Sequence, residues 1–300
     1  MIRRFAMPTL CAVRKLVLLA LALAALAAPP ALASDMGDEP EAGFFSYLPA
    51  PPKLKLPSIT IPFWTDDLKK AKNAYNDGNY SRAIKFFRKS SEDGNIVADW
   101  YLGHIYRTGK GVPVDPATAY SYYSRVAEAY DPEEGDSKRL RIMVDGQMRV
   151  ADYLRTGIPS AGIPADPGAA ARTYLRLAST YGHPDAQYQL GVLNLTGKGV
   201  RKNPQQGLKW LMAAARKRQP EAQAYLGSLY WDGKVVQRDE TRALMWYILA
   251  QQTANPAENG AIIERADALR SEVSAETRLE AEARARVWAD QYQGEDSLSP

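Results

Sequence analysis

The sequence has 300 residues, of which 38 are lysine or arginine, 34 are aspartate or glutamate, and one is cysteine. Four of the basic residues and the cysteine lie in an N-terminal segment that we expect to be removed, so the rest of the chain is formally neutral. Formal neutrality argues against a surface that tracks nucleic-acid phosphates, and we expect no nucleic-acid partner. Without cysteine, the remaining chain has neither a disulfide framework nor a thiolate metal site.

Residues 1–33 have the features of a secretory signal peptide. Four basic residues precede an apolar run from Leu16 to Ala28, and the small-residue triplet at 31–33 predicts cleavage before Ser34. A membrane anchor is the alternative, but the apolar run is shorter than the roughly 20 residues that a spanning helix needs. We therefore expect export and no integral membrane segment after signal cleavage.

Residues 34–63 are rich in proline and show no helical period. We expect an extended leader whose aromatic side chains dock either on the first helices or on a partner. Residues 64–257 carry the helical pattern, which begins near Asp66. Gly78 is expected to turn the chain between the two helices of a first hairpin that resembles a tetratricopeptide unit.

One helix-turn-helix unit occurs twice between Ala186 and Ala250, where Gly227 follows Gly191 in a matching context 36 residues later. The same template finds two earlier copies. The loop of each copy contains a glycine: Gly109, Gly157, Gly197 and Gly233. Six residues before these glycines stand Gly103, Ala151, Gly191 and Gly227. Small residues at this position allow the first helix of each copy to approach its neighbours closely.

The second helix of each copy is predicted to begin after a capping residue. These residues are Asp115, Asp166, Asn203 and Asp239. Seven residues beyond them stand Tyr122, Thr173, Trp210 and Trp246, which we interpret as a layer of the core. Three extra residues in the second copy predict a projecting loop at 160–164, and residues 258–300 are expected to form capping helices and a tail. The predicted fold is all-α, an α/α solenoid of helical repeats.

The Leu-Gly pair, the Gly-x-Gly-Val loop at 109–112 and 197–200, and the Asp/Asn-Pro cap resemble Sel1-like repeats, relatives of the tetratricopeptide repeat. The resemblance covers about Ala98 to Ala250. Residues 151–159 and 181–192, with the export signal and the lengthened second repeat, also resemble the rhizobial periplasmic negative regulators of exopolysaccharide production. That resemblance implies a periplasmic protein that restrains the sensor domain of a membrane histidine kinase in a two-component system.

No set of side chains in the sequence predicts an enzyme. Only His104 and His183 are present as histidines, and neither is placed to act as the base for a serine nucleophile. We expect a turn role for His183, which precedes Pro184, and a packing or surface role for His104. Histidine titrates in the physiological range, so the resemblance to a regulator adds a pH-sensing hypothesis for both. No cofactor-binding or metal-binding residue is predicted.

The partner-binding prediction concerns two equivalent positions of the first helices, seven residues apart and hence on about the same face. Asp99, Gln187 and Gln223 occupy one position, and Tyr106, Asn194 and Tyr230 occupy the other. This face would contact a partner if it lines the concave groove of the solenoid. Ordinary packing between repeats is the alternative for the tyrosines.

These features predict an exported solenoid that works by binding protein. The resemblance favours a negative regulator that acts on the sensor domain of a histidine kinase. A periplasmic scaffold for an envelope or polysaccharide assembly complex is the alternative. A hydrolase acting on cell-wall material is disfavoured because the sequence lacks a catalytic set.

Overall fold

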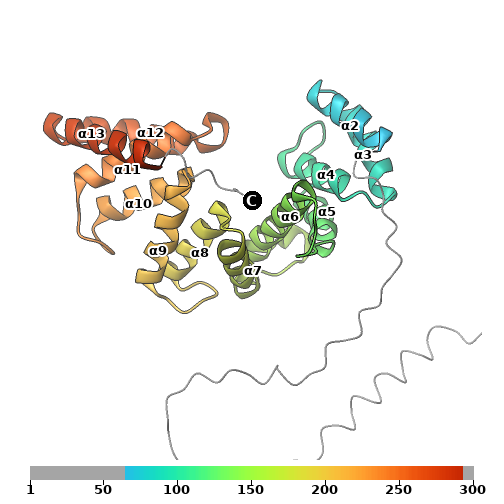
Figure 1. Ribbon diagram of the computed structural model, residues 1–300, viewed down its shortest axis with the longest axis horizontal. Coiled ribbons are helices and arrows are strands. Elements are labelled where there is room, and N and C mark those ends of the chain that lie inside the picture. The colour runs from blue at the N-terminus through green and yellow to red at the C-terminus, as the bar shows by residue number, and fades with distance from the viewer. Residues whose placement is uncertain (1–64, 293–300) are drawn as a thin grey trace, which may run out of the picture. The chain divides into compact units, whose positions relative to one another are not determined.

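The computed structural model describes residues 65–292 (Figure 1). The predicted signal peptide at residues 1–33, the predicted leader at residues 34–63 and the end of the predicted tail at residues 293–300 lie outside the described residues. No helix within residues 65–292 combines the length and the apolarity that crossing a membrane requires.

The all-α prediction is confirmed, since residues 65–292 contain helices and no strand. The helices form five hairpins followed by two further helices. The first helices of the hairpins are α2 (Asp66–Asn76), α4 (Ile96–Thr108), α6 (Ser137–Thr156), α8 (Pro184–Thr196) and α10 (Pro220–Asp232). The second helices are α3 (Tyr80–Glu92), α5 (Pro116–Glu128), α7 (Pro167–Thr180), α9 (Pro204–Arg216) and α11 (Glu240–Thr253). The chain continues into α12 (Pro256–Glu272) and α13 (Ala275–Tyr292).

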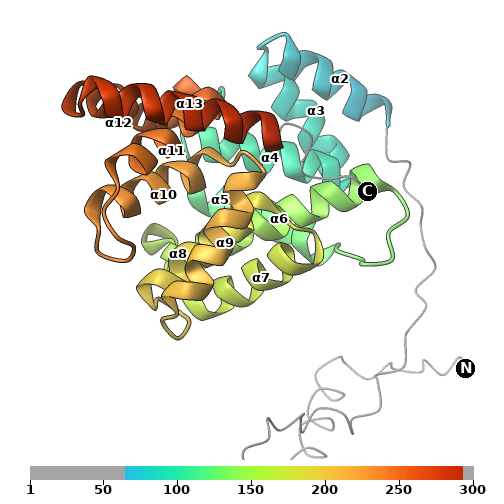
Figure 2. The ribbon, with the colours of Figure 1, turned by 60° about the vertical axis from the view of Figure 1, so that its left-hand side comes forward.

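Each helix from α3 to α11 packs against the helix before it and the helix after it. The hairpins therefore stack in chain order, as Figures 1 and 2 show, and this is the contact pattern of a solenoid. Some first helices also contact the next helix but one, since α4 contacts α6 and α10 contacts α12, the helix that follows the hairpins.

The second helices from α5 to α11 begin at the predicted caps. The Asp115 side chain accepts hydrogen bonds from the backbone N–H groups of Ala117 and Thr118, each at 3.1 Å. Asp166, Asn203 and Asp239 cap α7, α9 and α11 in the same way. These bonds satisfy backbone donors that have no partner within the helix, so the caps fix where each second helix starts.

The predicted close approach of the helices is confirmed at the small residues of the first helices. A Cβ atom added to Gly191 would lie 2.8 Å from Leu211 Cγ, and one added to Gly227 would lie 2.6 Å from Tyr247 Cδ2. A Cβ atom added to Gly103 would lie 2.8 Å from Tyr123 Cε1. Because glycine has no side chain, a large side chain of the second helix can occupy the space beside each of these residues.

The prediction that the large core side chain stands seven residues beyond the cap is wrong by one residue. At that position only Trp246 is buried, while Tyr122, Thr173 and Trp210 are half-buried. The buried residues stand eight beyond the cap: Tyr123, Tyr174, Leu211 and Tyr247. Positions four, eight and eleven beyond the cap are buried in every copy, and the seventh position lies at the flank of that face.

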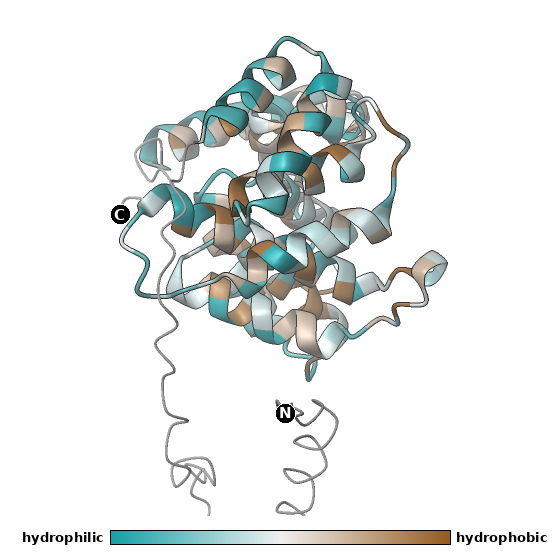
Figure 3. Cartoon of the chain, turned by 90° about the vertical axis from the view of Figure 1, so that its right-hand side faces the viewer, coloured by the Kyte–Doolittle hydropathy of each residue, from teal (hydrophilic) through white to brown (hydrophobic). Residues whose placement is uncertain are grey.

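The core consists of three hydrophobic clusters that follow one another along the stack. Most helices in Figure 3 carry both hydrophobic and hydrophilic segments, as expected for helices with one face buried between neighbours. The predicted loop between α6 and α7 contains the short 3-10 helix η1 (Pro159–Ala161), and residues 159–162 are exposed.

The C-terminal helices α12 and α13 both pack against α11 (Figure 2). The indole rings of Trp288 in α13 and Trp246 in α11 lie 4.7 Å apart between centroids. Ala281 and Ala285 on the same side of α13 are buried. These two helices therefore cover the C-terminal end of the repeats.

Candidate functional site

Two residues of the predicted partner-binding set, Asp99 and Tyr106, are buried in the first part of the stack. The Asp99 carboxylate accepts a hydrogen bond of 2.6 Å from the Ser91 hydroxyl and lies 3.3 Å from Arg125 Nη1. Burial raises the pKa of Asp99 above its ordinary value, although both contacts oppose this effect. The Tyr106 hydroxyl accepts a hydrogen bond from Arg88. Both side chains join neighbouring helices.

Gln187 and Gln223 are buried in the same way. The Gln187 side-chain amide donates to the carbonyl oxygen of Ala178 at 3.4 Å, and that of Gln223 donates to the carbonyl oxygen of Ala215 at 3.1 Å. Each bond ties a first helix to the end of the preceding second helix. These glutamines therefore serve the junction between consecutive hairpins.

Asn194 and Tyr230 are half-exposed, unlike the other four residues of the set. The Asn194 amide donates to the carbonyl oxygen of Leu190 at 2.8 Å within α8. The Arg242 guanidinium carbon lies 5.5 Å from the centroid of the Tyr230 ring. Only these two of the six residues offer substantial surface to a partner, and partner binding by the set stays a prediction.

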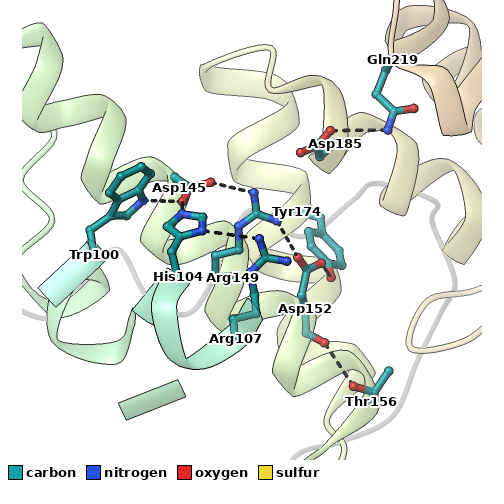
Figure 4. A network of polar contacts seen from close by, with 10 residues as sticks. All are labelled: Trp100, His104, Arg107, Asp145, Arg149, Asp152, Thr156, Tyr174, Asp185 and Gln219. Carbon is teal, nitrogen blue, oxygen red and sulfur yellow. Dashed lines mark hydrogen bonds and ion pairs between the residues drawn. The ribbon is translucent and has the colours of Figure 1, made fainter. Parts of the chain in front are cut away.

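A polar network that the sequence did not reveal joins the first helices α4 and α6 (Figure 4). Its centre is Asp145 on α6. The Trp100 indole N–H donates to Asp145 Oδ2 at 2.6 Å, His104 Nε2 lies 3.5 Å from the same oxygen, and Arg149 Nη2 lies 3.0 Å from Oδ1. One carboxylate thus meets an indole, an imidazole and a guanidinium group.

The network continues along α6 to the second helix α7. Arg149 Nη1 lies 3.6 Å from Asp152 Oδ2, and the Tyr174 hydroxyl donates to Asp152 Oδ1 at 2.8 Å. On α4, Arg107 Nη2 lies 3.4 Å from His104 Nδ1, so the imidazole receives a donor on one side and faces a carboxylate on the other. The chain of contacts spans two consecutive repeats.

The electrostatics of the network favour the ionised form of the Asp145–Arg149 pair, whereas burial raises the pKa of Asp152. Burial alone would raise the pKa of Asp145, but the nearby His104 imidazole, the charge of Arg149 and the hydrogen bond from Trp100 outweigh it and hold this pKa below its ordinary value. Burial alone would lower the pKa of Arg149, but the carboxylates of Asp145 and Asp152 raise it more, so this pKa lies above its ordinary value. The pair is therefore charged at neutral pH.

His183 lies before α8, close to the same network. Burial lowers its pKa, Asp185 and Asp145 oppose that shift, and Arg149 adds to it. The buried Nδ1 atom of His183 has no hydrogen-bond partner among the described residues. The native state therefore holds this imidazole in its neutral form more strongly than water does.

A second group of polar contacts links α8, α10 and α12. The Gln219 side-chain amide lies 3.5 Å from Asp185 and also donates to Glu221. The Asn259 amide then donates to Glu221 Oε1 at 2.7 Å. Beside these contacts, the rings of Tyr188 and Tyr225 lie 6.3 Å apart in an edge-to-face arrangement.

The two tyrosines line an open hollow with a volume of about 260 Å³. Its remaining walls are Glu221, Ala224, Ser228, Tyr247, Ala261, Ile262 and Arg265. The hollow combines aromatic rings, an acid and a base, and Tyr188, Tyr225 and Arg265 are half-exposed. Such a mixture suits protein recognition, because aromatic and arginine side chains dominate the energetics of interfaces.

We define the first-helix surface as the accessible residues of these contacts on the first helices α4, α6, α8 and α10 and on α12, which follows the last hairpin. Its members are Trp100, His104, Asp145, Arg149, Asp152, Asp185, Tyr188, Glu221, Tyr225, Asn259 and Arg265. A repeated signal in the sequence could have found its acids. Asp145, Asp185 and Glu221 each stand twelve residues before the loop glycine of their repeat.

The first-helix surface combines aromatic, acidic and basic side chains. Its acids are paired with bases or with amide and hydroxyl donors. Within residues 65–292 no group of three histidine, cysteine, aspartate or glutamate side chains could hold a metal ion.

The Sel1 repeat model matches five segments of the chain, at residues 77–95, 96–131, 144–183, 184–218 and 220–250. These include the four copies found by the repeat template, and the first segment overlaps the hairpin around Gly78. Among solved structures, the chain is similar to the crystal structure of c5321, a protective antigen present in uropathogenic Escherichia coli strains that displays an SLR fold. The TM-score is 0.56 at 26% identity, covering 77% of this chain and 46% of that chain.

Two curated relatives align with the repeats. The exopolysaccharide production negative regulator of Rhizobium leguminosarum bv. viciae is 33% identical over 141 residues, which cover 47% of this chain and 52% of the relative. The protein of the same name from Rhizobium meliloti (strain 1021) is 33% identical over 142 residues, with the same coverage. The chain spans about half the length of these relatives. Because the matched repeats make up more than half of its 300 residues, the chain belongs to the Sel1 repeat family.

Proposed function

We propose that this protein is an exported negative regulator that binds the sensor domain of a membrane histidine kinase and represses exopolysaccharide-type signalling. The observation that carries the proposal is the 33% identity with two proteins named as negative regulators of exopolysaccharide production. The kinase partner and the periplasmic location extend the proposal through the resemblance of the sequence to that family, and the predicted signal peptide supports export.

The first-helix surface is the binding surface in this proposal. The aromatic rings of Trp100, Tyr188 and Tyr225 are partly exposed. Trp100 lies beside Asp145 (Figure 4), and Glu221 and Arg265 line the hollow of the two tyrosines. Contacts between neighbouring repeats already hold these side chains in place, as the bond from Trp100 to Asp145 does. A surface ordered before binding loses less conformational entropy when a partner arrives.

Repression follows from binding if the solenoid prefers one state of the kinase. A protein that binds the inactive sensor domain more tightly than the active one shifts the kinase towards inactivity. The shift is limited by the difference between the two affinities, and it requires a stoichiometric amount of regulator. Loss of the complex then releases signalling.

The test is a crosslinking pull-down of residues 34–300, the predicted mature form, from the native envelope, with mass spectrometry of the captured proteins. Recovery of a membrane histidine kinase supports the proposal. Recovery of polysaccharide synthesis or export components without a kinase contradicts it and favours the scaffold alternative. Measurement of exopolysaccharide gene transcription in a deletion strain then separates repression from broken assembly.

Matched variants test the surface itself. Tyr188→Ala and Tyr225→Ala each remove a ring from the hollow, and we expect each to weaken capture of the kinase about ten-fold or more. Tyr120→Ala is the control, because Tyr120 lines a separate hollow of about 300 Å³ formed with Thr173 and Arg176 of α7. Equal capture by all three variants would remove the first-helix surface from the proposal.

A further inference from the structure

Helix α13 presents an apolar stripe on the side that faces away from α11. Leu279 and Val287 each expose 67% of their surface, and Ala283 between them is also exposed. The three residues are spaced by four, so they form one line along the helix. The opposite side of α13 is buried through Ala281 and Ala285. The stripe is thus left over after α13 has packed on the repeats.

An open hollow of about 330 Å³ adjoins the stripe, lined by Met245, Ala283, Arg284, Val287, Trp288 and Gln291. Terminal units of a solenoid normally turn a polar face outward, because no further repeat covers them. Helix α2 at the other end of the described residues follows this rule. Its exposed residues are Asp66, Lys69, Lys70, Asn73 and Asn76. Helix α13 departs from the rule, because Leu279, Ala283 and Val287 are exposed among its charged residues.

We propose that the stripe of α13 is a self-association surface, on which α13 of a second copy of this chain lies antiparallel. The contact is centred on Ala283, so Leu279 of each copy meets Val287 of the other. A two-fold axis through such a contact makes the interface self-complementary, which is the commonest arrangement in protein dimers. The hollow beside Val287 then receives side chains of the second copy.

The charges beside the stripe select the antiparallel arrangement. At about 100° per residue, Glu280 and Arg284 lie on one flank of the stripe, and Glu282 and Arg286 lie on the other. In the antiparallel pair, the two-fold axis is perpendicular to both helices. Each flank of one helix therefore lies beside the same flank of the other helix, and the two flanks run in opposite directions. Along the helix axis, each Glu280 then lies about 3 Å from Arg284 of the second copy, and each Glu282 lies equally close to Arg286.

A parallel pair would bring opposite flanks together. Glu280 would then neighbour Glu282 of the second copy, and Arg284 would neighbour Arg286, so like charges would meet at most positions. In the antiparallel pair one like-charge contact remains on each flank: Arg284 meets its own symmetry mate on one flank, and Glu282 meets its own on the other. Within each copy Arg284 Nη2 already lies 2.6 Å from Glu280 Oε1, which moderates the repulsion between the two arginines.

The ends of the helix limit the extent of the contact. Glu276 would face Asp290 of the second copy, and both are acidic. The favourable region is therefore confined to the central turns around Ala283, which places the interface at the small end of the known range. We expect a reversible dimer with a dissociation constant in the micromolar range, on the order of that for small transient interfaces.

Sedimentation velocity of residues 34–300 over a concentration series tests the proposal. The expected result is a monomer–dimer equilibrium that Leu279→Glu weakens at least about ten-fold. Leu175→Glu is the matched control, because Leu175 of α7 is also an exposed leucine, at 50%, and should leave the equilibrium unchanged. A wild-type chain that stays monomeric up to hundreds of micromolar would overturn the proposal, as would equal effects of the two substitutions.

Charge complementation between two chains gives the decisive test. Glu280→Arg alone and Arg284→Glu alone each place like charges opposite one another in a homodimer, and we expect either variant to dimerise at least about ten-fold more weakly. When the two variants are mixed, the bases of one chain face the acids of the other, so native mass spectrometry should show the heterodimer in excess. Statistical mixing of the two variants, or dimers of each variant alone as strong as wild type, would refute the antiparallel geometry.

Discussion

Gly191→Leu tests the central packing inference, that the stack depends on a missing side chain in each first helix. Even a Cβ atom at this position would lie 2.8 Å from Leu211 Cγ and 3.1 Å from the carbonyl oxygen of Gly207. Leu211 is fully buried and Gly207 contributes backbone, so neither can move aside locally. Overpacking of this kind costs about 1–3 kcal/mol, and the three further carbons of leucine place the substitution at the upper end of that range.

Helix propensity acts in the opposite direction. Replacing glycine inside a helix gains about 0.8–1 kcal/mol, so we expect a net loss near 2 kcal/mol, unless the helices separate and the loss grows. For a domain of this size, each kcal/mol lowers the melting temperature by about 2–4 °C, which gives a fall of about 4–8 °C. Circular dichroism during heating measures it.

Gly260→Leu is the matched control for this experiment. Gly260 is also helical, in α12, and a Cβ atom added there meets no atom within 4 Å. We expect this variant to be unchanged or slightly more stable, because only the propensity gain applies. Equal melting temperatures of the wild type and the Gly191 variant would refute the packing argument, and so would equal losses in the two variants.

Three further predictions concern a cap, a histidine and a loop. Asp115→Ala should destabilise the protein by about 1 kcal/mol in urea unfolding, because two backbone N–H groups lose their acceptor. His183→Gln should make stability less sensitive to acid. Burial lowers the pKa of His183, so the unfolded chain binds a proton more readily, and native stability falls as pH drops below about 6.5. Ala161→Ser and Pro164→Ser in the loop at 160–164 should each leave the melting temperature within about 1 °C, because both residues are exposed and lie outside the core.

Each of these predictions has a control. For the cap, Asp115→Asn retains an acceptor and should lose much less stability than the alanine variant. For the histidine, the unfolding free energy is compared between pH 7.5 and pH 5, and parallel curves for the wild type and the variant would remove His183 as an acid-sensitive group. For the loop, a large loss of stability would show that residues 160–164 support the repeats.

The fold was accessible from the sequence because its main determinants repeat. Asp115 and its equivalents mark the start of every second helix, and Gly191 and its equivalents mark where helices approach closely. These features depend on local hydrogen bonds and on the size of one residue, which a sequence displays directly. The loop glycines 109, 197 and 233 likewise take the left-handed conformation that ends a helix.

Periodicity alone could not choose between two adjacent positions on a helix. Tyr122 and Tyr123 are both aromatic, and both lie within one turn of the small residue Ala119. The buried member is decided by the position of the neighbouring first helix, where Gly103 leaves room for Tyr123. A one-residue error therefore arises where the sequence gives the spacing along one helix but not the angle at which the next helix arrives.

The same limit explains the candidate site. A residue that recurs at the same position of each repeat usually serves the contact between neighbouring repeats, which every repeat requires. Gln187 and Gln223 are examples, because both donate to backbone carbonyl groups at the junctions between hairpins. Residues that vary between copies carry the information about a partner. No other repeat has a tryptophan at the position of Trp100 or an arginine at the position of Arg149, yet both residues meet Asp145, whose position is acidic in three copies. Asp145, Asp185 and Glu221 occupy one position but contact different side chains, whereas Gln187 and Gln223 make the same contact in each repeat. The acidic position is therefore the better guide to the binding surface proposed for this solenoid.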